Sequence, residues 1–231
     1  MERRQAEAFL RRVTWLGEAP EDFQDQVLAK CDMLRYKKSD LIYDAGDEAS
    51  GLFGVVEGHL EVHLPAPGVT PTLSYIGGPG SWFGDIAAVT GARRRIAIIA
   101  GSDCQLLRLP RLEITRMTAS DPILWRQFLL LLARNYAKAI SLVWALKQDD
   151  PVKRVACLLL ILSEENLAGT GIAASQWDIA ELINLGRSKV NSSLKALEGR
   201  GHIRRRYGSI EVTNAVALRD FIAGPSERAR E

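Results

Sequence analysis

Residues 175–203 read SQWDIAELINLGRSKVNSSLKALEGRGHI, a pattern that predicts two short helices joined by a tight turn. Ser175, followed three residues later by Asp178, is a close relative of the capping box that starts a helix. Ala180 is small where a second helix must cross closely, and Asn184 tolerates the left-handed conformation that a chain reversal needs. The stretch therefore predicts a helix-turn-helix, whose second helix is free to enter a DNA major groove. The apolar residues that pack this second helix inward are Val190, Leu194 and Leu197.

A basic hairpin is expected directly after the second helix. Residues 202–213, HIRRRYGSIEVT, predict two strands that turn at Tyr207, Gly208 and Ser209. Three arginines at 204–206 lie on the incoming strand, where they could serve as a solubilising strand edge. Because a helix-turn-helix precedes it, the hairpin is interpreted as a wing whose arginines lie along phosphates.

Positive charge is concentrated in the same region. The 231 residues have a formal net charge of only +2, with 47% hydrophobic and 25% charged residues, which excludes a disordered or collagen-like chain. Between Gly186 and Arg206, however, seven basic side chains accompany a single acid, Glu198. Such a segment suits a phosphate-rich partner, although a solvated basic helix face would have the same composition.

A long helix is expected upstream. Ser120, Asp121 and Pro122 supply a helix cap with proline at the first helical position, and nothing breaks the helix before Gln148. Apolar residues then recur at alternating spacings of four and three, as in a coiled-coil seam. A helix of roughly 40 Å outruns the small domain beside it, which favours a dimer seam over a helix packed in its own core. The seam residues are Trp125, Leu129, Leu132, Tyr136, Ala139, Val143 and Leu146.

The region from about residue 34 to 110 has the pattern of short strands. Apolar and polar residues alternate with period two from His59 to Leu64. Ten of the 19 glycines fall between Gly46 and Gly91. Short strands cut by frequent glycine turns indicate a small antiparallel barrel or sandwich. Further strand candidates are residues 73–76, 96–100 and 105–109.

Other functional classes lack support. The N-terminal MERRQAEAFLRRV is too charged for a signal peptide, and three basic residues interrupt the apolar stretch 123–146, so a cytoplasmic protein without a membrane partner is expected. Three separated cysteines (Cys31, Cys104 and Cys157) form neither a disulfide framework nor a metal-ligand pattern. No GxxxxGK[ST] loop or nucleophile elbow occurs, so we expect no catalytic residue and no enzyme.

In this order the parts resemble the cyclic AMP receptor protein/fumarate-nitrate reductase regulator superfamily. The resemblance covers nearly the whole chain and includes the string FGD at 83–85 and the hinge segment DPVKRVA at 150–156. It implies an α+β fold with an N-terminal antiparallel β-roll (a cyclic-nucleotide-binding-like jelly roll), a long dimerisation helix and a C-terminal winged helix-turn-helix. The expected domains are 1–120, 121–148 and 149–231. The resemblance further implies a homodimeric transcription regulator with an effector site between β-roll and long helix.

The resemblance also implies which residues contact DNA. Arg187 matches the arginine with which the family commonly reads guanine at the start of the recognition helix. Ser188 and Ser192 stand where the family has glutamate and a second arginine, so the site is expected to share one guanine with the familiar palindrome and to differ beside it. The candidate DNA-binding residues are Arg187, Ser188, Lys189, Asn191, Ser192, Lys195, Arg204, Arg205 and Arg206.

The effector site departs from the pattern of cyclic-AMP-binding members. Arg95 stands where they hold the cyclic phosphate, but Asp85 is one methylene shorter than their glutamate and Ile96 lacks a hydroxyl donor. Ala139 and Ile140 replace the Thr-Ser pair that meets the adenine. Cyclic AMP is therefore not the expected effector, and Arg95 either holds another anion or pairs with Asp85 and fills the site. The expected pocket residues are Phe83, Gly84, Asp85, Ile86, Arg95, Ile96, Ala97, Tyr136, Ala139 and Ile140.

Cofactors and partners follow from the same comparison. No iron–sulfur cluster is expected, because the N-terminal cysteine cluster of oxygen-sensing relatives is absent. No haem is expected either, since His59 and His63 are interpreted as exposed side chains flanking Glu61. The expected partners are double-stranded DNA, a second copy through 121–148 and RNA polymerase. The alternatives are a cyclic-nucleotide-responsive regulator with a divergent pocket and a regulatory module that acts on a protein partner.

Overall fold

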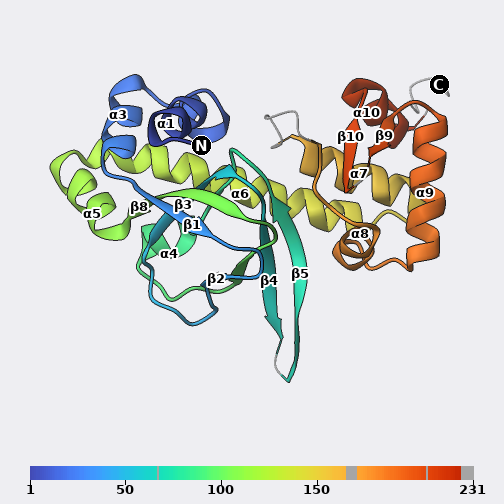
Figure 1. The fold of residues 1–231 in the computed structure, drawn as a ribbon, viewed down its shortest axis with the longest axis horizontal. Coiled ribbons are helices and arrows are strands. Elements are labelled where there is room, and N and C mark those ends of the chain that lie inside the picture. The colour runs from blue at the N-terminus through green and yellow to red at the C-terminus, as the bar shows by residue number, and fades with distance from the viewer. Residues whose placement is uncertain (67, 165–170, 207, 225–231) are drawn as a thin grey trace, which may run out of the picture. The chain divides into compact units, whose positions relative to one another are not determined.

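The computed structural model describes residues 1–66, 68–164, 171–206 and 208–224 (Figure 1). The chain divides into two compact units, Met1–Ala137 and Lys138–Glu231, which are described separately. The division falls inside the long helix, and the domain boundaries at 120/121 and 148/149 stay a prediction.

The first unit contains two four-stranded antiparallel sheets, which lie below a group of N-terminal helices in the view of Figure 1. The strand orders are β1-β8-β3-β6 and β2-β7-β4-β5, so apart from the β4–β5 hairpin neighbouring strands are distant in the chain, as expected for the β-roll. Its helices are α1 (Arg3–Leu10), α2 (Thr14–Gly17), α3 (Glu21–Ala29), α4 (Asp85–Thr90) and α5 (Arg111–Ser120). Its strands are β1 (Asp32–Tyr36), β2 (Leu41–Tyr43), β3 (Gly51–Glu57), β4 (Leu60–Ala66), β5 (Val69–Gly77), β6 (Trp82–Phe83), β7 (Ala97–Ala100) and β8 (Cys104–Pro110).

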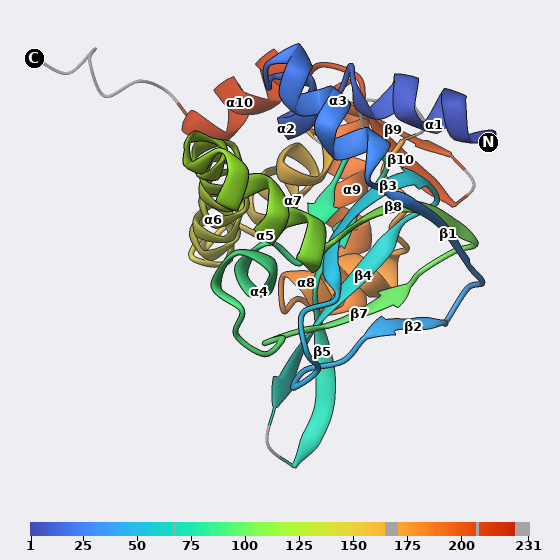
Figure 2. The same ribbon diagram turned by 90° about the vertical axis from the view of Figure 1, so that its left-hand side faces the viewer.

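The alternation predicted along β4 holds only for its first half. Leu60 and Val62 are buried, but Leu64 is 48% exposed. The reason is that β7 pairs with β4 only as far as His63, beyond which the β4–β5 hairpin continues alone (Figure 2). The interpretation of His59 and His63 as exposed was wrong: both are half-buried, and His63 Nε2 lies 3.3 Å from a Glu61 carboxylate oxygen.

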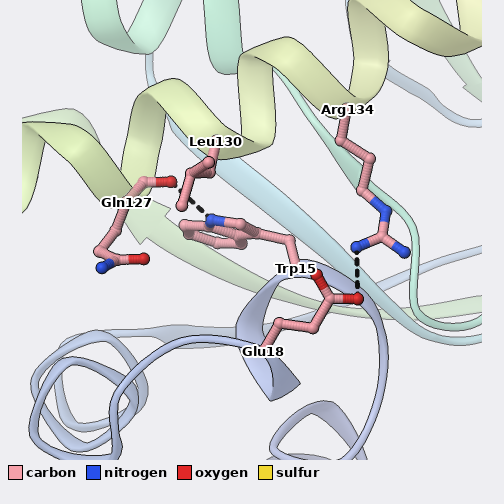
Figure 3. A pocket seen from close by; sticks show the side chains of 5 residues that line it. All are labelled: Trp15, Glu18, Gln127, Leu130 and Arg134. Carbon is pink, nitrogen blue, oxygen red and sulfur yellow. Dashed lines mark hydrogen bonds and ion pairs between the residues drawn. The ribbon is translucent and has the colours of Figure 1, made fainter.

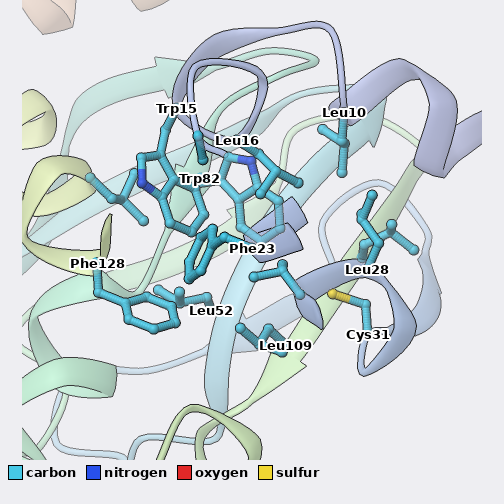
Figure 4. Packing of buried hydrophobic residues seen from close by; sticks show 14 of the residues in the cluster. Leu10, Trp15, Leu16, Phe23, Leu28, Cys31, Leu52, Trp82, Leu109 and Phe128 are labelled. Atoms are coloured by element: carbon cyan, nitrogen blue, oxygen red, sulfur yellow. The ribbon is translucent and has the colours of Figure 1, made fainter. Parts of the chain in front are cut away.

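An aromatic core joins the N-terminal helices to the sheets (Figure 4). The rings of Trp15 and Trp82 meet edge to face with centroids 5.3 Å apart, as do those of Phe23 and Phe128. Such contacts add about 0.5–1.5 kcal/mol each beyond the area that they bury. Since Phe128 belongs to α6 (Trp125–Leu146), the first turns of the long helix are part of this core.

Polar contacts hold the same helix to α2 (Figure 3). The indole N–H of Trp15 donates to the carbonyl oxygen of Gln127 over 2.6 Å, and Arg134 forms a 3.0 Å ion pair with Glu18. Together with Leu130 these side chains line a small pocket of about 240 Å³. The face of α6 that contacts the N-terminal helices is therefore largely distinct from its seam, although the seam residue Trp125 packs against the same core.

Most of the seam faces solvent, although Trp125 and Leu132 are half-buried and Trp125 packs against the aromatic core. The expected cap is confirmed, because Asp121 accepts a hydrogen bond from the amide of Ile123 ahead of a 3-10 turn, η1 (Pro122–Leu124), that leads into α6. Tyr136 is 66% exposed and Val143 55%, whereas Phe128 is fully buried. By length and mean hydropathy alone the segment Pro122–Leu146 could also cross a membrane. Its core and ion-pair contacts place its first half in a folded domain instead.

The second unit carries the predicted winged helix-turn-helix. Asp150 accepts a hydrogen bond from the amide of Val152 and Pro151 is the first helical residue, so the cap predicted for the helix after the hinge is confirmed. A β-bridge between Ile172 and Ile210 attaches the segment before the helix pair to the hairpin. The elements are α7 (Pro151–Ser163), α8 (Gln176–Leu182), α9 (Arg187–Gly199), β9 (Ile203–Arg206), β10 (Ser209–Val212) and α10 (Ala215–Ala223).

Candidate nucleic-acid interface

The helix-turn-helix is built by the residues that predicted it. The Ser175 hydroxyl accepts from the amide of Asp178 over 3.2 Å, and the Asp178 carboxylate accepts from the amide of Ser175 over 2.6 Å, which completes the capping box. Asn184 has φ +50°, the left-handed conformation expected at the turn. The inward residues of α9 are fully buried: Val190, Leu194 and Leu197. The opposite face of α9 is thereby presented to solvent.

The first turn of α9 is basic and open. Gly186 at its N-cap provides no side-chain acceptor, and Arg187, Ser188 and Lys189 are all exposed. The amides of a first helical turn have no intrahelical partner, and the helix dipole adds positive potential at that end. An anionic partner such as a phosphate would satisfy both.

The remaining candidates on α9 lie on or beside this surface. Ser192 and Lys195 are exposed, and the Ser192 hydroxyl donates to the carbonyl oxygen of Lys189 over 3.0 Å. Asn191 is half-buried, and its amide oxygen lies 3.4 Å from the guanidinium of Arg205. Lys195 is thus available to an external partner, whereas Asn191 is directed toward the hairpin.

The hairpin places its arginines on two faces. Strands β9 and β10 pair antiparallel as predicted, although Tyr207 of the expected turn lies outside the described residues. Arg204 and Arg206 are exposed and share the carboxylate of Glu211, at 3.8 and 3.0 Å. Exposed ion pairs of this kind contribute little, so a phosphate can compete for both arginines.

Arg205 instead joins the hairpin to the recognition helix. Its Nε donates to a Glu198 carboxylate oxygen over 2.7 Å, and its backbone amide donates to the other oxygen over 2.9 Å. Arg205 and its backbone amide hold the pKa of Glu198 below its ordinary value. Of the three wing arginines, Arg205 is therefore engaged within the protein, and Glu198 is a residue of this surface that sequence reasoning missed.

A second residue that sequence reasoning missed is Trp177. Its ring lies under the guanidinium of Arg187, with the guanidinium carbon 4.1 Å from the ring centroid. The signal in the sequence was an aromatic residue two positions after the cap Ser175, exposed at 64%. Nothing in the linear spacing places it beside Arg187, because the two residues lie on different helices.

In the β-roll the buried arginine is Arg94 and not its neighbour Arg95, which is exposed. Arg94 is 4% exposed, and its two terminal nitrogens donate to the carbonyl oxygens of Gly84 and Gly51 over 2.9 and 2.8 Å. The guanidinium carbon lies 4.1 Å from the centre of the Tyr43 ring. Arg94 is thus held on two edges and one face by the protein itself.

The position of the Arg94 guanidinium requires glycine at residue 84. Its φ is +87°, and a Cβ at this position would collide with the Arg94 guanidinium and the Gly51 carbonyl. Burial lowers the pKa of Arg94, and the charges of Tyr43 and Asp85 act in the opposite direction. Burial likewise raises the pKa of Tyr43.

The expected pocket residues differ widely in exposure. Phe83, Asp85 and Ala97 are buried, Ile96 is half-buried, and Ile86 and Tyr136 are exposed. Within the first unit, Gly84 meets Arg94 directly. Ala139 and Ile140 are exposed and belong to the part of α6 in the second unit. The assignment of these residues to an effector pocket stays a prediction.

The next question is whether the described residues include a metal-ligand cluster or a reactive cysteine thiol. Within the described ranges no group of three or more His, Cys, Asp or Glu could hold a metal ion. The three cysteines are buried, and burial raises the pKa of Cys31 to about 12 and that of Cys157 to about 11. A thiol with so high a pKa is a poor nucleophile at neutral pH.

Family models match both units. Residues 33–121 match the cyclic nucleotide-binding domain, and residues 153–221 match the Crp-like helix-turn-helix domain. A β-roll of this type joined to such a helix-turn-helix defines a transcription regulator with a DNA-binding domain. The chain belongs to the cyclic AMP receptor protein/fumarate-nitrate reductase regulator superfamily.

Individual relatives agree with this assignment. The chain is 28% identical to the cyclic AMP receptor protein of Thermus thermophilus, over 90% of this chain and 95% of that protein. It is 23% identical to the CRP-like cAMP-activated global transcriptional regulator of Mycobacterium tuberculosis, over 79% of this chain and 84% of the relative. Among solved structures, FixK2 from Bradyrhizobium japonicum shares the fold with a TM-score of 0.71 at 21% identity, covering 85% of this chain and 99% of that one.

Proposed function

We propose that the chain is a sequence-specific regulator that binds a pseudo-palindromic DNA site as a homodimer, in the cytoplasm and without catalytic activity. The observation that carries the proposal is the open, basic first turn of α9, presented by a complete helix-turn-helix. Two copies would place Arg187 in successive major grooves about 34 Å apart. Contact with RNA polymerase is part of the same proposal, on the grounds that the Mycobacterium tuberculosis relative is a global transcriptional regulator.

The test is selection of a binding site from a random duplex library with the full-length protein, followed by affinities across a salt series. Counterion release predicts that affinity falls steeply as salt rises. Arg187→Ala is expected to cost about 1–3 kcal/mol of discrimination at one guanine per half-site. Lys189→Ala, its matched control, should weaken all duplexes alike and reduce the salt slope by about one. A duplex affinity that ignored salt and both substitutions would favour a module that acts on a protein partner.

The effector is the second part of the proposal: cyclic AMP does not act here in the way that the Mycobacterium tuberculosis relative's description implies for that protein. Three features support this. Ile96 offers no hydroxyl, Arg95 is exposed, and Arg94 is already bonded to backbone carbonyls. A divergent pocket that still responds to a cyclic nucleotide is the alternative.

Thermal unfolding of the full chain with millimolar cyclic AMP or cyclic GMP distinguishes a protein that does not respond to these nucleotides from one with a divergent but responsive pocket. A ligand at 100 times its dissociation constant adds about 2.7 kcal/mol, which shifts the midpoint by several degrees. We expect no shift with either nucleotide. A clear shift with cyclic AMP would contradict this part of the proposal and leave the DNA-binding part untouched.

A further inference from the structure

Trp177 and Arg187 form a stacked pair across the two helices of the helix-turn-helix. Trp177 lies in the first turn of α8 and Arg187 is the first residue of α9, with the guanidinium carbon 4.1 Å from the centre of the indole ring. The indole is the strongest partner for this cation–π contact among the aromatic side chains. We propose that Trp177 positions Arg187 for reading guanine and so sets the strength of base discrimination, an inference that rests on the proposed DNA-binding function.

The geometry of an arginine makes this arrangement productive. The guanidinium is planar, and its N–H donors all point outward within the plane. The indole occupies one face of the plane and leaves the donors unused. Within the described part of the chain, no hydrogen bond or ion pair engages the guanidinium of Arg187. A stacked Arg187 can therefore still donate two parallel bonds to O6 and N7 of a guanine.

The local electrostatics explain why an aromatic partner is needed. Arg187 stands at the positive end of the α9 dipole, two residues from Lys189, where a cation is disfavoured. A carboxylate paired with Arg187, as Glu198 is paired with Arg205, would offset this repulsion, but it would also compete with the DNA for the same donors. The indole face attracts the cation and competes for none of its donors.

The stack also limits the conformations of a long side chain. An unrestrained arginine loses rotamer entropy when it is ordered on a partner. Because Trp177 already restrains the guanidinium in the free protein, less of that entropy remains to be lost on the DNA. Removing the indole is therefore expected to weaken binding only where Arg187 reads a base.

The first measurement concerns the free protein and needs no DNA. Protons held over an indole face are shifted upfield in NMR spectra. The side-chain signals of Arg187 are expected to move toward ordinary values in Trp177→Leu and to stay partly shifted in Trp177→Phe. Val216→Ala, which alters another exposed apolar residue of the second unit, is the matched control and should leave them unchanged. Signals that are already ordinary in the native protein would overturn the proposal.

The second measurement uses the duplex enriched from the random library, with guanines replaced by 7-deazaguanine, which lacks the N7 acceptor. Trp177→Leu is expected to lose about two- to fivefold in affinity for the guanine duplex. Its loss should be clearly smaller on the duplex with 7-deazaguanine at the base that Arg187 reads, and its salt slope should equal that of the native protein. Trp177→Phe should recover part of the loss.

The outcomes distinguish this inference from the function on which it rests. Equal losses on both duplexes would mean that Trp177 does not act through Arg187, and the inference would fail while DNA binding stands. The affinity loss of Trp177→Leu could instead shrink when thymine is replaced by uracil, which lacks the methyl group. That result would show direct contact of Trp177 with a thymine methyl group and would overturn the proposal that Trp177 positions Arg187. Failure of the native protein to enrich any duplex would overturn the proposed function, and the inference with it.

Discussion

Val143→Asp is expected to convert the protein to a monomer and to abolish tight binding to a two-half-site duplex. Val143 lies at an inward position of the predicted seam and is 55% exposed in the single chain. In a parallel pair of helices the two copies of this residue would face each other, so the substitution would bury two carboxylates side by side. Burial of unpaired charges costs several kcal/mol, enough to dissociate an ordinary coiled coil.

DNA binding should fall with the dimer. Two linked recognition helices gain about 10²–10⁴ in affinity over one, because the second contact is intramolecular. Sedimentation should therefore report a monomer, and affinity for the full site should drop to that for a half-site. Ser141→Asp introduces the same charge on the outer face of α6, at an exposed position off the seam, and is the control that should stay dimeric. A dimeric Val143→Asp with native affinity would remove α6 as the interface.

The helix-turn-helix could be predicted from the sequence because its determinants are local. A capping box joins residues three apart, and a left-handed turn needs one tolerant residue, so both signals lie within a few positions of the element that they define. Ser175, Asp178 and Asn184 accordingly have the roles predicted for them. The caps at Asp121 and Asp150 were predictable for the same reason.

The sequence failed to predict burial where the burial of a side chain depends on residues far along the chain. Leu64 follows the alternation of β4, but the length of β7, some thirty residues later, decides which part of β4 is covered. Arginines 93–95 form an unbroken run in the loop between α4 and β7, where no helix or strand period indicates which side chain points inward. Arg94 enters the interior because the carbonyls of Gly51 and Gly84 are placed there by the sheet. No spacing rule contains that information.

Arg94→Ala is expected to destabilise the first unit strongly, and Arg95→Ala hardly at all. Loss of the Arg94 guanidinium leaves the carbonyls of Gly51 and Gly84 without their donor and removes the cation beside the buried Asp85. Breaking a buried charged network from one side costs about 3–5 kcal/mol. Arg95 is exposed, and surface substitutions of this kind usually change stability by no more than about 0.5 kcal/mol.

Thermal unfolding of both variants, followed by near-ultraviolet circular dichroism of the aromatic core, measures the difference. A loss of about 3–5 kcal/mol lowers the midpoint of a domain this size by roughly 10 °C or more. Arg94→Lys should lose most of the same stability, because an ammonium cannot bond two carbonyls in one plane while stacking on Tyr43. Equally small changes in the unfolding midpoint of Arg94→Ala and Arg95→Ala would mean that Arg94 does not stabilise the first unit.

The comparison of these two neighbours also bears on the effector. An arginine kept for a ligand is held in a polar site that is incomplete without the ligand, so its removal abolishes the response and costs little stability. An arginine whose donors are bonded to backbone carbonyls has the opposite signature, since its removal costs stability whether or not a ligand is present. The structure gives Arg94 the second set of contacts. Arg94→Ala is therefore expected to lose stability in the absence of any ligand.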